Sequence, residues 1–173
     1  PIERSLFWKS LRNRILSLER GAYGTVLRVT LERIPEVWTD ADLPFPYCHG
    51  DFVPWNAFDL GERIFLFDWE YARRSWLPGY DLFHFLVQTR LLLSAAAPIR
   101  ILRDVLESSL SGETVGAYWQ RLGIEERDIR ILLLLYLMER LTHRLSRPSG
   151  WDPTLQRTRA LLDLCRAEAG FAP

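Results

Sequence analysis

Apolar residues return at intervals of three and four over most of this 173-residue chain. That spacing puts them on one face of a helix, so it predicts amphipathic helices packed around a shared core. The predicted helices cover 3–20, 25–38, 78–93, 98–110, 113–122, 125–147 and 153–169. Because 131–138 is apolar at every position, we expect the helix at 125–147 to lie buried at the centre of the molecule.

The helical pattern is interrupted between residues 40 and 70. Pro44 and Pro46 disfavour helix in the residues before them, so the chain is expected to be extended here and to enter a short strand at 46–49. A hairpin with strands at 57–60 and 63–67 is predicted to follow, and its imperfect alternation predicts that both of its faces are covered. The expected fold class is therefore α+β and predominantly helical, with a single domain over residues 1–173.

Glycine, proline and short polar residues set the expected helix boundaries. Gly21 and Gly24 predict a helix stop and a turn; they do not predict a phosphate loop, because no strand and no Walker lysine accompany them. Pro35 is expected to kink or end the second helix. Ser111 is the expected cap of the helix at 113–122, and Asp152 that of the last helix.

Composition bounds the class of protein. The chain is 48% hydrophobic and carries seven Trp, which excludes a disordered chain. Its formal net charge is zero and it has no long basic run, so charge favours neither nucleic acid nor a membrane surface as a partner. The longest apolar run is too short to span a bilayer, and a cytoplasmic location is expected. Cys48 and Cys165 form no disulfide framework, and Cys48 is expected to be a small buried hydrophobe.

Three polar residues stand at fixed intervals around the predicted hairpin. Asn56 follows Asp51 by five positions, and Asp68 ends the apolar run of the second strand. A carboxylate at the start of a tight loop can orient the proton of an acceptor hydroxyl. The Asn carbonyl oxygen and the returning carboxylate can hold magnesium against nucleotide phosphates. This pattern is what a phosphoryl-transfer site requires.

The same residues resemble a known family. His49-Gly50-Asp51 followed by Asn56 resembles the H-G-D-x-x-x-x-N signature of the aminoglycoside phosphotransferase and choline kinase superfamily. Asp68-Trp69-Glu70 is similar to its second metal motif, and the segment 78–82 to the Asp-containing start of its next helix. The resemblance implies the large, C-terminal lobe of a protein-kinase-like fold, with a small β-hairpin that carries the catalytic and metal residues. Gly50 stands where protein kinases have Arg, which favours the small-molecule branch.

The resemblance also implies roles for individual residues. Asp51 would be the catalytic base, and Asn56 and Asp68 would bind Mg²⁺ and, through it, ATP. His49 would buttress the loop, and Asp81 would be a structural support. The implied reaction transfers the γ-phosphoryl group of ATP to a hydroxyl of a sugar, an aminoglycoside, a choline-like molecule or a related alcohol.

The sequence is compatible with more than one role for several neighbouring residues. Glu70 is a candidate for a second magnesium, for substrate contact, or for an ion pair with a neighbouring arginine. Trp55 either lines the acceptor pocket or packs beneath the loop. Tyr71 and Trp76, together with Tyr80, either form an aromatic cage for a quaternary ammonium group or belong to the core.

Two further expectations concern histidines and arginines. His84 is expected to be packed or exposed, not a ligand, and His143 to interact with a helix dipole. Arg73 and Arg74 would suit an acceptor that carries its own negative charge.

The nucleotide side of the reaction is the part that the sequence does not supply. Kinases of the superfamily carry a small lobe with a sheet, a phosphate-covering loop and a lysine, whereas Lys9 is the only lysine of this sequence and falls on the first predicted helix. We therefore expect an N-terminal nucleotide lobe of the same polypeptide to be a partner, and weak Mg-ATP binding and slow turnover without it. A non-catalytic binding module on the same fold is the alternative, although all three key polar residues are present.

Overall fold

The computed structural model describes residues 2–19, 21–38, 43–146 and 153–171. The described part is predominantly helical, with one small antiparallel sheet, as the sequence predicted. The helices are α1 (Leu6–Ser17), α2 (Ala22–Val37), α3 (Tyr80–Leu93), α4 (Pro98–Leu110), α5 (Glu113–Leu122), α6 (Glu126–Leu145) and α7 (Pro153–Glu168). The strands are β1 (Ala57–Asp59) and β2 (Ile64–Leu66), and the short 3₁₀ helices are η1 (Ile2–Arg4), η2 (Pro54–Asn56) and η3 (Trp69–Tyr71).

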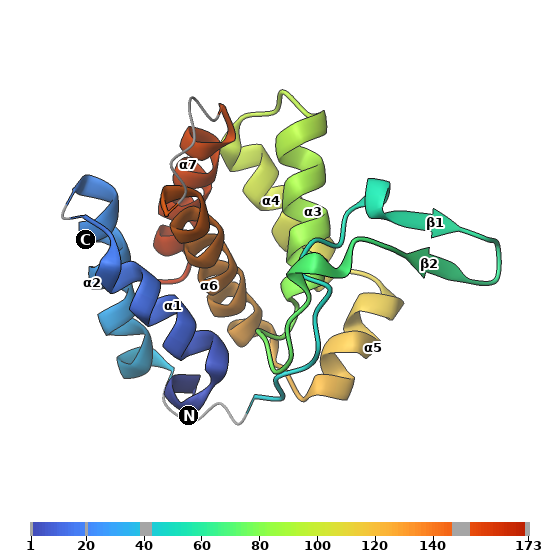
Figure 1. The fold of residues 1–173 in the computed structure, drawn as a ribbon, viewed down its shortest axis with the longest axis horizontal. Helices are drawn as coiled ribbons and strands as arrows, with labels where there is room; N and C mark the ends of the chain where they lie inside the picture. Colours follow the sequence, from blue (N-terminus) through green and yellow to red (C-terminus); the bar gives the residue numbers. More distant parts are fainter. Residues whose placement is uncertain (1, 20, 39–42, 147–152, 172–173) are drawn as a thin grey trace.

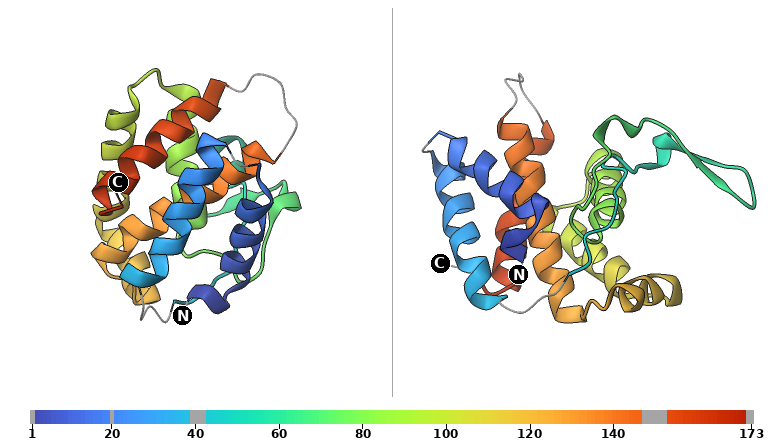
Figure 2. Two further views of the ribbon diagram at one scale, coloured as in Figure 1. Left: turned by 90° about the vertical axis from the view of Figure 1, so that its left-hand side faces the viewer. Right: turned by 60° about the horizontal axis from the view of Figure 1, so that its bottom comes forward.

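The core is built around α6. This helix runs between α1 and α2 on one side and α3 on the other (Figures 1 and 2), and it packs against α7, α3, α1 and α4. All seven residues from Leu132 to Met138 are buried, which confirms the expectation of a central helix. Each such side chain removed from water stabilises the fold by about 1.5–3 kcal/mol, so α6 fixes the positions of the elements around it.

The β-hairpin projects away from the helices (Figure 1), with Ala57 opposite Leu66 and Asp59 opposite Ile64. The prediction that both of its faces are covered is wrong. Phe58 and Ile64 are 61% and 65% exposed, because within the described residues no other element packs over the strands. The strands are also shorter than expected.

The predicted strand at 46–49 is reduced to a single bridge. The backbone N–H of Cys48 donates to the Arg73 carbonyl at 3.0 Å, and the N–H of Arg73 returns the bond at 3.0 Å. The ladder stops there because Pro46 has no N–H to donate and Ser75 adopts a left-handed conformation (φ 55°). Trp76, one residue out of register, then donates to the Pro46 carbonyl at 2.8 Å. Cys48 itself is buried, and its burial raises the pKa of the thiol to about 12, in agreement with a packing role.

Two helix boundaries differ from the predictions, those at Gly21 and at Ser111. Gly21 is the N-cap of α2, so Gly24 lies inside a helix and not in a turn. Pro35 also lies within α2, close to its end, where the missing N–H costs one hydrogen bond of the last turn. Ser111 ends α4 and does not cap α5, because Gly112, at φ 97°, separates the two helices. The predicted cap at Asp152 lies outside the described residues.

Both cysteines are free and buried, so no disulfide joins them. Over the described ranges, no helix combines the length and the apolar character needed to cross a membrane.

Candidate active site at the 49–56 loop

The carboxylate of Asp51 lies between two side-chain donors. Oδ1 is 2.9 Å from Nε2 of His84, which comes from α3, and Oδ2 accepts a hydrogen bond of 2.9 Å from Nδ2 of Asn56. About a third of the Asp51 side chain remains exposed. The carboxylate is therefore held in one orientation while a face of it stays open to an incoming hydroxyl.

The Asn56 amide has its orientation fixed by its neighbours. Nδ2 donates to the Asp51 backbone carbonyl at 3.0 Å as well as to its carboxylate, and both partners are acceptors, so the nitrogen must be on that side. Oδ1 consequently points away from Asp51. Among the described residues no donor contacts Oδ1, which leaves the oxygen available to a cation.

Asp68 lies beside Asn56 at the base of the hairpin. The N–H of Phe67 donates to the Asn56 carbonyl at 3.2 Å, which places Asp68 one residue beyond the partner of Asn56. Asp68 is exposed and left-handed (φ 64°), a conformation uncommon for a residue other than Gly. Its carboxylate has no hydrogen bond or ion pair with any other described side chain.

The donors of Asn56 and Asp68 fit a magnesium ion that is held mainly by phosphate. Mg²⁺ keeps several waters and takes one or two protein oxygens together with substrate phosphates. In the described part of the chain, no three His, Cys, Asp or Glu side chains gather as a preformed metal cage. Asn56 and Asp68 would supply two oxygen ligands, which is the number that Mg²⁺ takes from a protein when phosphates and waters supply the others.

The loop that carries Asp51 is anchored from two directions. Asp81, in the first turn of α3, accepts hydrogen bonds from the backbone N–H groups of His49 (2.7 Å) and Gly50 (2.9 Å). The His49 ring accepts the Asp51 N–H at Nδ1 (3.3 Å), so its Nε2 carries the proton and donates to the Phe67 carbonyl (2.9 Å). The ring of His49 thus joins the loop to the end of the hairpin.

Gly50 is required where it stands. Its φ is +85°, and a Cβ added there would lie 2.2 Å from the Tyr71 carbonyl oxygen. Any side chain at this position would push the loop away from η3, so the Gly of the sequence motif has a local steric cause.

The buried ring of His84 joins Asp51 to Tyr136 through two hydrogen bonds. The ring is 1% exposed, and burial lowers its pKa, so the neutral imidazole donates from Nε2 to Asp51. Nδ1 is then an acceptor, 3.2 Å from the hydroxyl of Tyr136 on α6. The hydrogen bond from His84 in turn lowers the pKa of Asp51, which keeps the carboxylate ionised at neutral pH.

The sequence left open whether His84 is packed or exposed, and its contact with Asp51 was not predicted. One signal was present: Tyr80 and His84 are four residues apart on α3, and their rings stack with centroids 6.0 Å apart. Polar groups at helical spacing on the buried face of a helix require partners, and Asp51 and Tyr136 are the partners found here.

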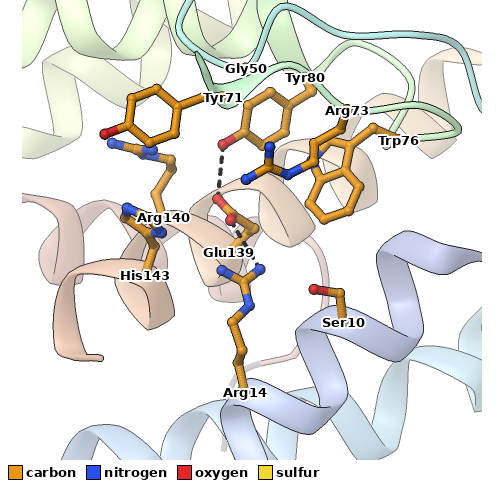
Figure 3. Close-up of a pocket in the computed structure, with 10 residues that line it drawn as sticks. All are labelled: Ser10, Arg14, Gly50, Tyr71, Arg73, Trp76, Tyr80, Glu139, Arg140 and His143. Atoms are coloured by element: carbon orange, nitrogen blue, oxygen red, sulfur yellow. Dashed lines mark hydrogen bonds and ion pairs between the residues drawn. The ribbon is translucent and has the colours of Figure 1, made fainter. Parts of the chain in front are cut away.

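A cavity of about 210 Å³ adjoins the loop on the side of α1 and α6. Figure 3 shows the side chains that surround it. Its lining consists of Ser10, Arg14, Gly50, Tyr71, Arg73, Trp76, Tyr80, Glu139, Arg140 and His143. Two of the candidate substrate residues, Tyr71 and Trp76, are therefore brought together, and the lining includes Gly50, the residue that precedes Asp51.

The other two candidate substrate residues lie outside the cavity. Trp55 is 48% exposed on η2, and Glu70 is exposed on η3. Within the described residues Glu70 makes no ion pair with Arg73 or Arg74. Nothing in their placement assigns either residue a ligand.

The Asp51–His84 pair predicts a pH dependence of stability. Burial lowers the pKa of His84 from its ordinary value of 6.5. Near pH 6.5 the imidazole therefore binds a proton in the unfolded chain but not in the folded chain. The free energy of unfolding should consequently fall as pH drops below 6.5. The lowered pKa of Asp51 adds a further loss only below pH 3.8. Urea unfolding at pH 7.5, 6.5 and 5.5 measures the slope.

The matched variant for this experiment is His84→Gln, which can still donate to Asp51 but does not titrate. Its stability should vary less with pH over the same interval. Parallel curves for the two proteins would show that His84 binds its proton equally well in the folded and the unfolded chain, so that burial does not lower its pKa. Asp81 and Arg140 also act on His84, with opposite signs, so both should be retained in every sample.

Comparison of the chain with protein-family models, curated proteins and solved structures found no match. The function is therefore argued from the geometry of the site.

Proposed function

We propose that this chain is the C-terminal, substrate-binding lobe of an ATP-dependent phosphotransferase that acts on an alcohol. The observation that supports this most strongly is the Asp51–Asn56–Asp68 arrangement. His84 keeps the Asp51 carboxylate ionised, and the Asn56 amide that contacts this carboxylate has its own oxygen on the side away from it. A second carboxylate, that of Asp68, stands at the base of the hairpin without a hydrogen bond or ion pair to another described side chain.

Each residue then has a role that its contacts support. Asp51 orients the acceptor hydroxyl and receives its proton as the phosphoryl group is transferred. Asn56 and Asp68 would hold Mg²⁺, which supplies charge neutralisation for the nucleotide phosphates. His84 and Tyr136 fix the orientation of Asp51, while Asp81 fixes the loop.

The hairpin offers a place for the nucleotide lobe of the same polypeptide. Phe58 and Ile64 are exposed, as is Phe65 at 59%, so the strands present apolar surface beside the proposed metal ligands. Exposed apolar surface of this kind marks an interaction site. We propose that an N-terminal lobe and the nucleotide cover it, which would explain why this lobe alone should bind Mg-ATP weakly.

Thermal unfolding with magnesium and ATP tests the proposal. At an ATP concentration about ten times Kd, the midpoint of the chain should rise by roughly 3–6 °C, because the ligand binds only the folded state. The rise should disappear in Asp68→Asn and with EDTA, since both remove the metal contact.

Glu62→Gln is the matched control, because it removes an exposed acid from the turn of the same hairpin. It should leave the shift intact. An equal shift in Asp68→Asn would contradict the metal role of Asp68, and no shift for the unmodified chain at 20 mM Mg-ATP would contradict a nucleotide site on this lobe.

A further inference from the structure

The cavity beside the catalytic loop is lined by an excess of positive charge. Arg14 comes from α1, Arg73 from the segment after η3, and Arg140 from α6, so three distant parts of the chain bring guanidinium groups to one space (Figure 3). Glu139 is the one carboxylate among the lining residues, so the charged side chains sum to +2 with His143 neutral.

Glu139 is already satisfied by its neighbours. Its Oε1 accepts a hydrogen bond of 3.0 Å from Arg14, and its Oε2 accepts one of 2.9 Å from the hydroxyl of Tyr80. This pair engages Arg14. Among the described residues no carboxylate lies within ion-pair distance of Arg73 or Arg140, although the charge of Glu139 and a hydrogen bond with Tyr80 act on Arg140 and raise its pKa. The Nε groups of Arg14 and Arg140 are buried and have no hydrogen-bond acceptor there.

Buried donors without acceptors cost free energy, and a bound anion would remove that cost. Planar guanidinium groups bind carboxylate and phosphate with paired, charge-assisted hydrogen bonds. The remaining wall is aromatic, formed by Tyr71, Trp76 and Tyr80, and suits a carbon skeleton. A quaternary ammonium or a polycationic aminoglycoside would be repelled, so the aromatic cage considered from the sequence is disfavoured.

The cavity adjoins the loop that carries the proposed reaction centre. Gly50 lines it and directly precedes Asp51 in the chain. The positive charge of Arg140, another lining residue, contributes to lowering the pKa of Asp51 and of His84. A molecule in this cavity would therefore contact the loop one residue before the carboxylate that orients the hydroxyl.

We propose that Arg73 and Arg140 bind the anionic group of the acceptor, so that the substrate is a hydroxyl compound carrying a carboxylate or a phosphate. This assignment rests on the proposed function, because it names the acceptor of that reaction. About 210 Å³ corresponds to roughly seven water molecules of liquid volume, which suits a compact polyol acid or sugar phosphate.

Binding of four polyols of similar size, measured by ligand-observed NMR in EDTA, tests the proposal. Gluconate and glucose 6-phosphate are anionic, glucose is neutral and glucosamine is cationic. The two anions should bind at least tenfold more tightly than glucose, and glucosamine should not bind. Equal binding of glucose and gluconate, or binding of neither anion, would overturn the proposal.

Arginine variants locate the site. Arg73→Gln and Arg140→Gln should each weaken gluconate binding about tenfold or more, since each removes a hydrogen bond between two charged groups. Arg73 is exposed, so its variant should fold even if Arg140→Gln does not, and circular dichroism checks both. Arg74→Gln is the matched control, because that guanidinium lies over the Tyr47 ring, 5.8 Å from its centroid, and outside the cavity. An equal loss in Arg74→Gln would indicate nonspecific attraction and overturn the proposal.

The same samples separate acceptor from donor. If the anion is part of the acceptor, it should bind without metal, and it should bind equally well to Asp68→Asn. Binding that requires Mg²⁺ and is lost in Asp68→Asn would instead assign the arginines to the nucleotide phosphates. That result would refute the acceptor role. If the Mg-ATP shift is absent while gluconate binds through Arg73, the proposed function fails and the anion site stands. If the shift is present and gluconate does not bind, only the acceptor assignment fails.

Discussion

Replacing Asp51 by Asn is expected to lower the rate of phosphoryl transfer by about 10²- to 10⁴-fold, the usual contribution of a positioned general base. The side chain keeps its size and can still accept the hydrogen bond of His84, but it has no charge and cannot take the proton of the acceptor hydroxyl. ADP release with Mg-ATP and a panel of hydroxy acids and sugar phosphates, in a protein that includes its nucleotide lobe, measures the effect.

Whether the loss of activity in Asp51→Asn falls on kcat or on KM for ATP is as informative as its size. KM for ATP should change little, because Asn56 and Asp68 are the proposed metal ligands, so the loss should fall on kcat. Asp104→Asn, the same chemical change on α4, should retain full activity. A loss of less than tenfold in Asp51→Asn would remove Asp51 from the reaction and favour a non-catalytic module on this fold.

The parts of the structure that could be predicted are those decided by residues close together in the sequence. The run at 131–138 is apolar on every side, so it had to be buried, and α6 is the core of the molecule. The spacing of Asp51, Asn56 and the hairpin predicted the loop, because five residues and one turn leave the chain few ways to connect them. The exposure of the hairpin could not be predicted in this way, since apolar residues in a strand do not show which element, if any, covers them.

The partners of the site residues come from distant parts of the chain. His84 is 33 positions after Asp51, and Arg14 is 125 positions before Glu139. No periodicity connects residues so far apart; only the packing of α1, α3 and α6 brings them together. Arg140 directly follows Glu139 at the end of the apolar run, and this charged pair was the one local signal in the sequence for the cavity that both residues line.

Replacing Asp81 by Ala is expected to lower the free energy of unfolding by about 2–5 kcal/mol, because the backbone N–H groups of His49 and Gly50 would both be left without their acceptor. Both residues are buried, so water does not readily replace the carboxylate. Urea unfolding at pH 7.5 measures the loss, and the midpoint should fall while the denaturant slope stays the same.

The size of this loss distinguishes two explanations of the same aspartate. As a negative charge in the first turn of α3, Asp81 would contribute only about 0.3–1 kcal/mol through the helix dipole. As the acceptor of two buried backbone donors, it should contribute several times more. Glu113→Ala removes an acid from the first turn of α5 and gives the dipole contribution alone. If both variants lose the same small amount, the loop is not held by Asp81, and the position of Asp51 must depend on His84 and Asn56 alone.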